Sequence, residues 1–246
     1  MKKICLKRIL PVLLVMVLCV AQFLPVGAVD SDDYDYEFTE EDVARSFASF
    51  ITGYYTIIPE MCGVPASAVE SYTFGGTLTR ANADRVIWFS FFLELLKSFV
   101  TEDGSMSFED YATEDGNLVI PEETVKAMIS NYCSISNPDV TLSSLYDSEQ
   151  KAIVILVEDV MKLSAADSPY YGFFDETQSG LEYVFQDNKL SVSYDFINSD
   201  RSHSLRVALA LEADGSWMDS LNNSEAMMNV KLSSFEIVKE NEMLQF

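Results

Sequence analysis

The sequence predicts an α+β fold in which N-terminal helices pack on a curved C-terminal antiparallel β-sheet. Between residues 39 and 137, apolar side chains recur at the three- and four-residue spacing of helices. From residue 138 to residue 246 they alternate with polar side chains, which is typical of half-buried antiparallel strands. Hydrophobic residues make up 48% of the chain, enough to bury a core despite its charge. We therefore expect one folded unit over residues 39–246, a helical region with a small β-hairpin followed by a sheet region.

Residues 1–28 have the three parts of a secretory signal peptide. Basic residues precede an apolar run from Ile9 to Val20, and small residues lead up to a cleavage site after Ala28. The apolar run is about a dozen residues, against the roughly 20 that a membrane-spanning helix needs, which disfavours an uncleaved anchor. A lipid anchor is a further alternative because Cys19 lies in this run, but Leu18 stands where a lipoprotein signal has Gly or Ala. The sequence thus predicts a secreted, extracellular protein without a membrane segment after cleavage.

The mature chain is strongly acidic. Removing the leader takes away four of the 16 basic residues and none of the 39 acidic ones, which changes the net charge from −23 to −27. Nucleic acid is bound mainly through Lys and Arg, so nucleic-acid binding is disfavoured, and anionic membrane surfaces are repelled. Residues 29–38, rich in Asp, Tyr and Glu, are interpreted as an extended acidic tail.

The first helix is expected to begin at Thr39, because Thr39 and Asp42 form an acidic capping box. Pro59 is expected to end it. Its apolar stripe consists of Val43, Phe47, Phe50, Ile51, Tyr54, Tyr55 and Ile58.

A second helix is expected to follow a cap at Asn82. Residues 86–100 are apolar on nearly every face, as in a membrane span or a central helix packed on several sides. Glu94 and Lys97 interrupt this run, which favours the central helix. The expected core residues are Trp88, Phe92, Leu95 and Leu96.

A third helix is expected after Ile120, with Pro121 at its first position and Glu122 and Glu123 at the positive end of its dipole. Its buried stripe is Val125, Met128, Ile129 and Tyr132.

Five strands are expected from the two-residue period. Four of them are residues 181–186, 190–196, 205–211 and 228–238. Asp187–Asn188 and Asp214–Gly215 are turn signals, and the change of phase between Leu232 and Phe235 indicates a bulge. The fifth is residues 151–158, with a helix as the alternative.

One segment contains a weak candidate for calcium. Asp103, Glu109 and Asp110 follow the apolar helix in a pattern that resembles the second half of an EF-hand loop. The first half lacks the usual oxygen ligands, and Asp110 stands in place of the bidentate Glu. We favour a β-hairpin pairing residues 106–112 with 118–120, and we expect no cofactor.

No residue is singled out as catalytic. His203 is the single histidine, and the chain has no Gly-x-Ser-x-Gly turn for a nucleophile. Paired carboxylates hydrolyse glycosides, but the acidic residues are too many for the sequence to nominate a pair. Cys62 and Cys133 remain after the leader, as a disulfide or as two buried thiols.

An aromatic cluster is the candidate ligand-binding segment. Tyr170, Tyr171 and Phe173 lie between a proline and further aromatic residues, in a stretch that cannot be a regular element. Exposed, they would recognise a sugar, a peptide or a partner protein. Buried, they would cover the sheet, and this reading is favoured.

Four turn and cap motifs follow one another in the second half of the chain. They are a Tyr-x-Thr-x-Asp-Gly turn at Tyr111–Gly116, a helix start at Ile120–Glu123, a strand entry at Tyr146–Ala152 and a meander at Leu181–Trp217. This pattern resembles uncharacterised secreted proteins of Gram-positive anaerobes, a family with no activity to carry over. The expected layout is also similar to cystatin and nuclear-transport-factor-like folds, which host binding and catalysis alike.

Together these observations predict a non-catalytic extracellular binding or interaction module, with a protein or a carbohydrate as its partner. The alternative is a secreted hydrolase that uses paired carboxylates, acting on carbohydrate.

Overall fold

The computed structural model describes residues 39–61, 64, 69–100, 108–156, 179–197, 203–213, 217 and 229–242. These residues form three α-helices and two open antiparallel sheets, which confirms the α+β class. The helices are α2 (Glu40–Met61), α3 (Ala83–Val100) and α4 (Glu122–Tyr132), with short 3₁₀ turns η2 (Val69–Ser71), η3 (Phe108–Tyr111) and η4 (Val140–Leu142). The small sheet has β1 (Leu118–Pro121), β2 (Tyr146–Asp147) and β3 (Ala152–Ile155). The large sheet has β4 (Ser179–Gln186), β5 (Lys189–Ile197), β6 (His203–Ala213) and β7 (Val230–Glu242).

The N-terminus of α2 has the expected capping box. The N–H of Asp42 donates to Oγ1 of Thr39 at 3.2 Å, and the N–H of Thr39 donates to Oδ2 of Asp42 at 2.9 Å. The expected end at Pro59 is wrong, because α2 continues to Met61. Proline has no N–H to donate to the carbonyl of Tyr55, and Nη1 of Arg85 on α3 donates to that oxygen instead, at 3.0 Å.

The helix α3 is the central element of the core. The expected core residues Trp88, Phe92, Leu95 and Leu96 are all buried, as the central-helix interpretation requires. Asn82 immediately precedes α3, at the expected cap position, and its carbonyl accepts from the N–H of Val86 at 3.0 Å. Its side chain turns back to the preceding segment, where Oδ1 accepts from the N–H of Thr79 at 2.8 Å and Oγ1 of Thr79 accepts from the N–H of Asn82 at 3.3 Å.

No helix in the described part of the chain is long and apolar enough to cross a membrane.

The helix α4 presents the expected stripe, since Val125, Met128, Ile129 and Tyr132 are buried. Pro121 was expected to be the first residue of this helix. It is instead the last residue of β1, with ψ of 143°, and it immediately precedes the helix.

The expected hairpin of residues 106–112 with 118–120 is wrong. Residues 101–107 lie outside the described residues, Phe108–Tyr111 form a 3₁₀ turn, and a single bridge joins Ala112 to Leu118. β1 pairs instead with β3, which places Leu118 opposite Ile155 and Ile120 opposite Ile153. These cross-strand apolar pairs stabilise the small sheet.

The large sheet confirms the expected strands. Its order is β4-β5-β6-β7, all antiparallel, and Asp187 takes φ of 54° in the turn between β4 and β5. A register shift between Ala210 and Leu211 of β6 confirms the bulge expected near Leu232 of β7. The turn signal at Asp214–Gly215 lies outside the described residues.

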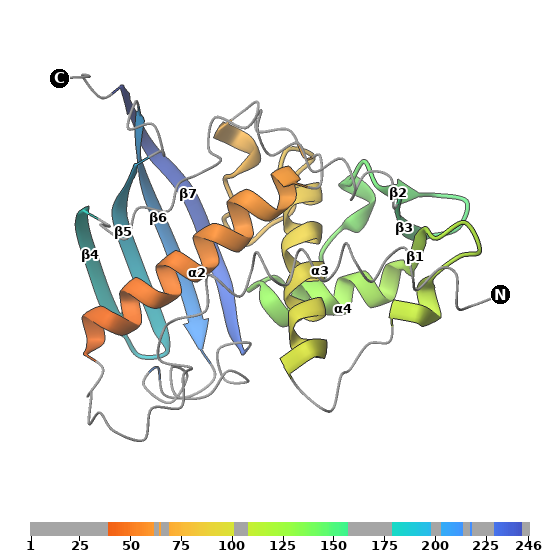
Figure 1. Ribbon diagram of the computed structural model, residues 1–246, viewed down its shortest axis with the longest axis horizontal. Coiled ribbons are helices and arrows are strands. Elements are labelled where there is room, and N and C mark those ends of the chain that lie inside the picture. The colour runs from red at the N-terminus through yellow and green to blue at the C-terminus, as the bar shows by residue number, and fades with distance from the viewer. Residues whose placement is uncertain are drawn as a thin grey trace.

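The two faces of the large sheet have different neighbours. α2 crosses one face, and the small sheet lies at the end of the molecule away from β4 (Figure 1). On the face toward α2, Tyr194 donates to Oγ1 of Thr52, and the ring of Phe235 lies 4.7 Å from that of Tyr55. The alternate residues of each strand point to the opposite face, which forms the candidate site.

Cys133 follows α4 and is a buried free thiol. Cys62 lies outside the described residues.

Candidate functional site

A groove lies on the face of the large sheet away from α2. One row of outward side chains is set by the strand register: Glu182 of β4, Ser193 of β5, Ala208 of β6 and Glu236 of β7. The next row is Val184, Ser191, Ala210 and Ser234. The two central strands therefore contribute only Ser and Ala, and larger side chains lie on β4 and β7. The result is a trough of about 530 Å³ with a floor close to the backbone.

A short segment forms the wall beyond β7. Phe74 and Phe235 exchange two backbone hydrogen bonds of 2.8 Å, which fix Thr73 and Gly75 beside the groove. This segment precedes α3, so the core helix and the groove wall are joined through a few residues.

Arg206 of β6 closes one end of the groove. Its Nη2 lies 3.1 Å from Oε2 of Glu182 and donates to Oγ of Ser193 at 3.1 Å, and its Nη1 lies 3.2 Å from Oδ2 of Asp195. Nη1 also donates to the carbonyl of Gly180 at 3.1 Å. These contacts hold Glu182 at the rim.

Gly180 makes this arrangement possible. Its φ is +63°, and a Cβ there would lie 2.9 Å from Nη1 of Arg206 and 2.9 Å from Oδ2 of Asp195. The backbone conformation thus favours glycine, and a Cβ at this position would displace the side-chain ends of Arg206 and Asp195.

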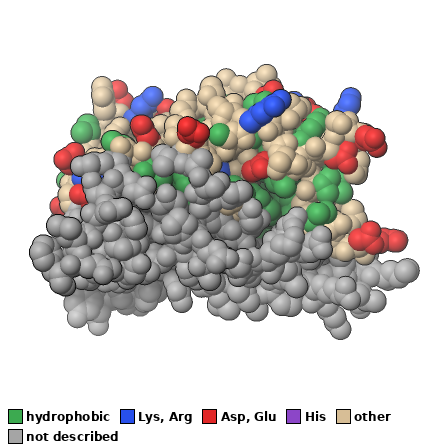
Figure 2. Space-filling model, turned by 90° about the horizontal axis from the view of Figure 1, so that it is seen from above, with side chains coloured by type: hydrophobic (Ala, Val, Ile, Leu, Met, Phe, Trp, Pro, Cys, Tyr) green, Lys and Arg blue, Asp and Glu red, His purple; other side chains and the backbone are tan. Residues whose placement is uncertain are grey.

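Charged side chains stand at both ends of the groove. Two carboxylates and one guanidinium at the Arg206 end leave one net negative charge, and the exposed Glu236 adds a second at the opposite rim. Elsewhere, on the described part of the face shown in Figure 2, charged side chains of both signs are scattered among neutral ones. The outward row at the other end consists of Gln186, Lys189, Glu212 and Lys231 and carries one net positive charge. The carboxylates of Glu182 and Glu236 at the rims are therefore the groups of the groove that would contact a cation.

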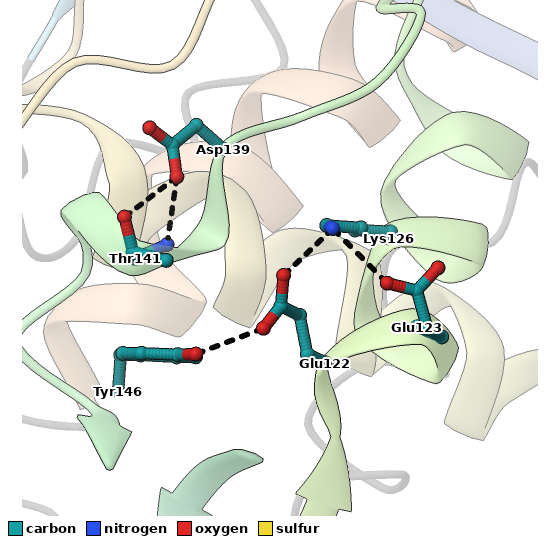
Figure 3. A network of polar contacts seen from close by, with 6 residues as sticks. All are labelled: Glu122, Glu123, Lys126, Asp139, Thr141 and Tyr146. Atoms are coloured by element: carbon teal, nitrogen blue, oxygen red, sulfur yellow. Dashed lines mark hydrogen bonds and ion pairs between the residues drawn. The ribbon is translucent and has the colours of Figure 1, made fainter. Parts of the chain in front are cut away.

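A second polar cluster joins α4 to β2. Oε2 of Glu122 accepts from Oη of Tyr146 at 2.8 Å and Oε1 lies 2.7 Å from Nζ of Lys126, which also contacts Glu123 (Figure 3). The hydrogen bonds from Lys126 and Tyr146 lower the pKa of Glu122. A carboxylate held in its ionised form is a poor general acid, so this cluster fastens the small sheet to α4.

A third cluster fastens α4 to the large sheet. Oγ of Ser134 donates to Oε2 of Glu212 at 2.7 Å, Oγ of Ser233 donates to Oγ of Ser134 at 3.1 Å, and Lys189 lies 3.0 Å from Glu212. The hydrogen bond from Ser134, followed by that from Lys189, lowers the pKa of Glu212. Glu212 is thus unsuited to take a proton from Ser134, and the cluster is structural.

The residues nominated from sequence are not brought together. Tyr170, Tyr171, Phe173 and Asp103 lie outside the described residues. Glu109 and Asp110 lie on η3, and no group of three or more metal-ligating side chains occurs in the described part of the chain.

His203 is the first residue of β6, where its backbone pairs with Glu242.

The groove residues were missed from sequence, although part of the signal was present. The strands 190–196 and 205–211 were identified from their alternating apolar residues. The residues between these point to the opposite face, and they include Ser191, Ser193, Ala208 and Ala210. Small residues on the outward phase of two successive strands indicate a hollow, provided that the strands are neighbours. Only the register shows that Glu182 and Glu236 lie in the same row.

Comparison with protein-family models, curated proteins and solved structures found no significant match to this chain.

Proposed function

We propose that this protein is an exported, non-catalytic binding protein, and that the groove of the large sheet holds a positively charged, extended segment of a partner protein. The observation that carries the proposal is the row that runs from Glu182 through Ser193 and Ala208 to Glu236. It combines a low floor with a carboxylate at each rim.

The floor favours an extended chain. Ser and Ala project little from the sheet, so the backbone of a ligand can approach closely, and the Ser191 and Ser193 hydroxyl groups offer hydrogen bonds to it.

The rims favour a cationic ligand. Glu182 and Glu236 are exposed carboxylates on opposite walls, with Glu182 in an ion pair with Arg206, and the chain without its leader has a net charge of −27. The whole-protein field steers cations toward the molecule, and the rim carboxylates provide the local contacts.

The contacts of Glu182 favour binding over the carboxylate-based hydrolase. Oε2 of Glu182 lies 3.1 Å from Nη2 of Arg206 and accepts from Oγ of Ser193 at 3.3 Å. A glycoside hydrolase needs a carboxyl group that is free to act on the glycosidic bond, and this one is engaged by residues of the sheet.

The exported location is the part of the proposal that comes from sequence. Residues 1–28 have the arrangement of a cleavable leader. N-terminal sequencing of the natural protein is expected to begin at Val29, and a sequence that begins at Met1 would contradict export.

The binding proposal is tested by titrating the purified protein with a fluorescent, lysine-containing extended peptide and with its glutamate counterpart. The lysine peptide is expected to bind, more weakly as salt is added, and the glutamate peptide is not. The double variant Glu182→Gln/Glu236→Gln is expected to lose most of this binding.

The matched control is Glu114→Gln/Glu149→Gln, which makes the same charge change at two exposed positions in other parts of the fold. It is expected to keep the binding. An equal loss in both double variants would mean diffuse attraction to net charge and would contradict the groove. Binding of an uncharged oligosaccharide, with no binding of the lysine peptide, would replace the proposal with a carbohydrate partner.

A further inference from the structure

The two outer strands of the large sheet have different neighbours. On the outer side of β7, Phe74 exchanges two backbone hydrogen bonds with Phe235. β4 is the other outer strand, at the end of the sheet away from α3 and α4 (Figure 1), and within the described part of the chain it pairs with β5 alone. One side of β4 is therefore available to a further strand.

The turn after β4 shows which of its backbone groups point outward. Gln186 and Lys189 flank a two-residue turn and form its closing pair, which is hydrogen-bonded. Because hydrogen-bonded pairs alternate along an antiparallel ladder, Val184 also bonds to β5, whereas the N–H and C=O groups of Tyr183 and Phe185 point away from it. No backbone hydrogen bond from the described residues reaches these outward groups.

The apolar side chains of β4 are covered on one side only. On the face toward α2, Val192 and Tyr194 of β5 are fully buried, whereas Tyr183 and Phe185 of β4 are half-buried. On the opposite face, Val184 is 61% exposed. A strand added beside β4 would cover apolar surface on both faces.

β4 also lacks the residues that commonly block strand edges. Natural edge strands are often protected by lysine or proline. Ser179–Gln186 contains neither, and its one charged residue, Glu182, lies in an ion pair with Arg206. β4 itself therefore presents little charge that would repel a second copy of the same strand.

We infer that β4 pairs antiparallel with β4 of a second copy of this chain, about a two-fold axis at Val184. The pairing joins two four-stranded sheets into one continuous sheet, with both grooves on the same face. The inference concerns self-association and does not depend on the ligand of the groove.

The sequence of β4 is complementary to itself in this register. Tyr183 lies opposite Phe185 of the partner subunit and the reverse, which pairs aromatic side chains and joins all the outward backbone groups of these residues. Glu182 lies opposite Gln186 of the partner subunit, and the two Val184 side chains meet at the axis. An axis at Glu182 would instead set two carboxylates against each other, which is unfavourable.

The experiment is sedimentation equilibrium of the purified protein. An interface built around one strand is small, so the dimer is measured at concentrations up to about 100 µM. Val184→Lys places two like charges directly opposite each other and is expected to raise the dissociation constant of the dimer about tenfold. The matched control is Val238→Lys, since Val238 is 55% exposed on β7, and it is expected to leave the dimer unchanged.

The diffuse effect of charge has the opposite sign. Either lysine lowers the net negative charge of the protein and so reduces the general repulsion between two copies. Weaker association of Val184→Lys alone would therefore reflect the local contact.

A mixture of two variants tests the position of the axis. Val184→Glu is also expected to weaken the dimer, but in an equimolar mixture with Val184→Lys the opposite charges face each other. Native mass spectrometry is expected to show heterodimers in excess of both homodimers.

Three results would each overturn the inference: a protein that stays monomeric over the whole concentration range, equal weakening by Val184→Lys and Val238→Lys, or a mixture without an excess of heterodimer. Circular dichroism confirms that each variant is folded before its association is compared.

Discussion

Arg85 of α3 donates from Nη1 to the carbonyl oxygen of Tyr55 at 3.0 Å, and the same nitrogen donates to the carbonyl of Thr56 at 2.9 Å. In an unbroken helix the carbonyl of Tyr55 would accept from the N–H of residue 59, which is proline and has none. The buried guanidinium also lies over the ring of Tyr72, 3.8 Å from its centroid. One arginine of α3 thus replaces the donor that α2 lacks and joins the two helices.

Arg85→Met is expected to destabilise the fold by about 2 kcal/mol or more, since it leaves buried carbonyls without this donor. In a Pro59→Ala background the same change should cost about 1 kcal/mol less, because alanine at that position restores an N–H for the carbonyl of Tyr55. Urea denaturation of the parent protein, the two single variants and the double variant measures this coupling. Additive effects would show that the contribution of Arg85 is independent of the backbone hydrogen bond that is missing at Pro59.

Gly180→Ala is expected to lower stability by about 1 to 2 kcal/mol, because it combines a φ of +63° with the displacement of Arg206. Gly75→Ala is the matched control, since a Cβ at that position has no atom within 4 Å. The control should change the melting temperature little. An equal shift in both variants would mean that Gly180 is not required.

Tyr132→Phe tests the bond between α4 and α3, in which Oη of Tyr132 donates to Oε2 of the buried Glu94 at 2.7 Å. Hydrogen bonds to charged groups contribute about 1.5 to 3 kcal/mol, and the loss in urea denaturation should fall in that range. Tyr146→Phe removes a similar bond to Glu122 near the surface and should cost less. A larger loss for Tyr146→Phe would contradict this ranking.

Cys133 should resist alkylation in the folded protein. Burial raises the pKa of its thiol to about 12, and the thiolate is the species that reacts. Native protein treated with iodoacetamide at pH 8 is expected to leave the Cys133 peptide unmodified by mass spectrometry, whereas urea-unfolded protein is labelled. Rapid labelling under native conditions would contradict the buried, neutral thiol.

Acid should weaken the attachment of α4 to the large sheet. The hydrogen bond from Ser134 holds the pKa of Glu212 below its ordinary value of 4.5, so its stabilising effect is present above that pH and is lost as the pH falls through the lowered value. Urea midpoints at pH 6 and pH 3 measure this loss. Ser134→Ala should make the difference between the two midpoints smaller, and an unchanged difference would exclude the bond as a cause.

Local signals predicted much of the fold. The capping box at Thr39, the buried stripe of α4 and the bulge of β7 each depend on residues close in sequence, and each was predicted correctly. The continuation of α2 past Pro59 was not predictable in this way, because its donor comes from residue 85. The partner of β1 was missed for the same reason, since β3 follows it only after α4, η4 and β2.

The candidate site was almost invisible to sequence. Glu182 and Glu236 are 54 positions apart among 39 acidic residues, and nothing local distinguishes them. Their relation depends on strand order and on two register shifts in β6 and β7, which are properties of the assembled sheet. The apolar alternation predicted which face of the sheet is buried. A groove on the other face can be inferred from its side chains only when the order of the strands is known.

The edge of β7 that does not pair with β6 pairs with other segments of the same chain. Phe74 exchanges two hydrogen bonds with Phe235, and the N–H of Ser134 donates to the carbonyl of Leu232 at 2.9 Å. An exposed strand edge is a template for intermolecular β-pairing and for fibril growth. Because these backbone groups already have partners, another molecule cannot add a strand along this part of β7 without first displacing the segments around residues 74 and 134, so the sheet is protected from polymerisation on this side.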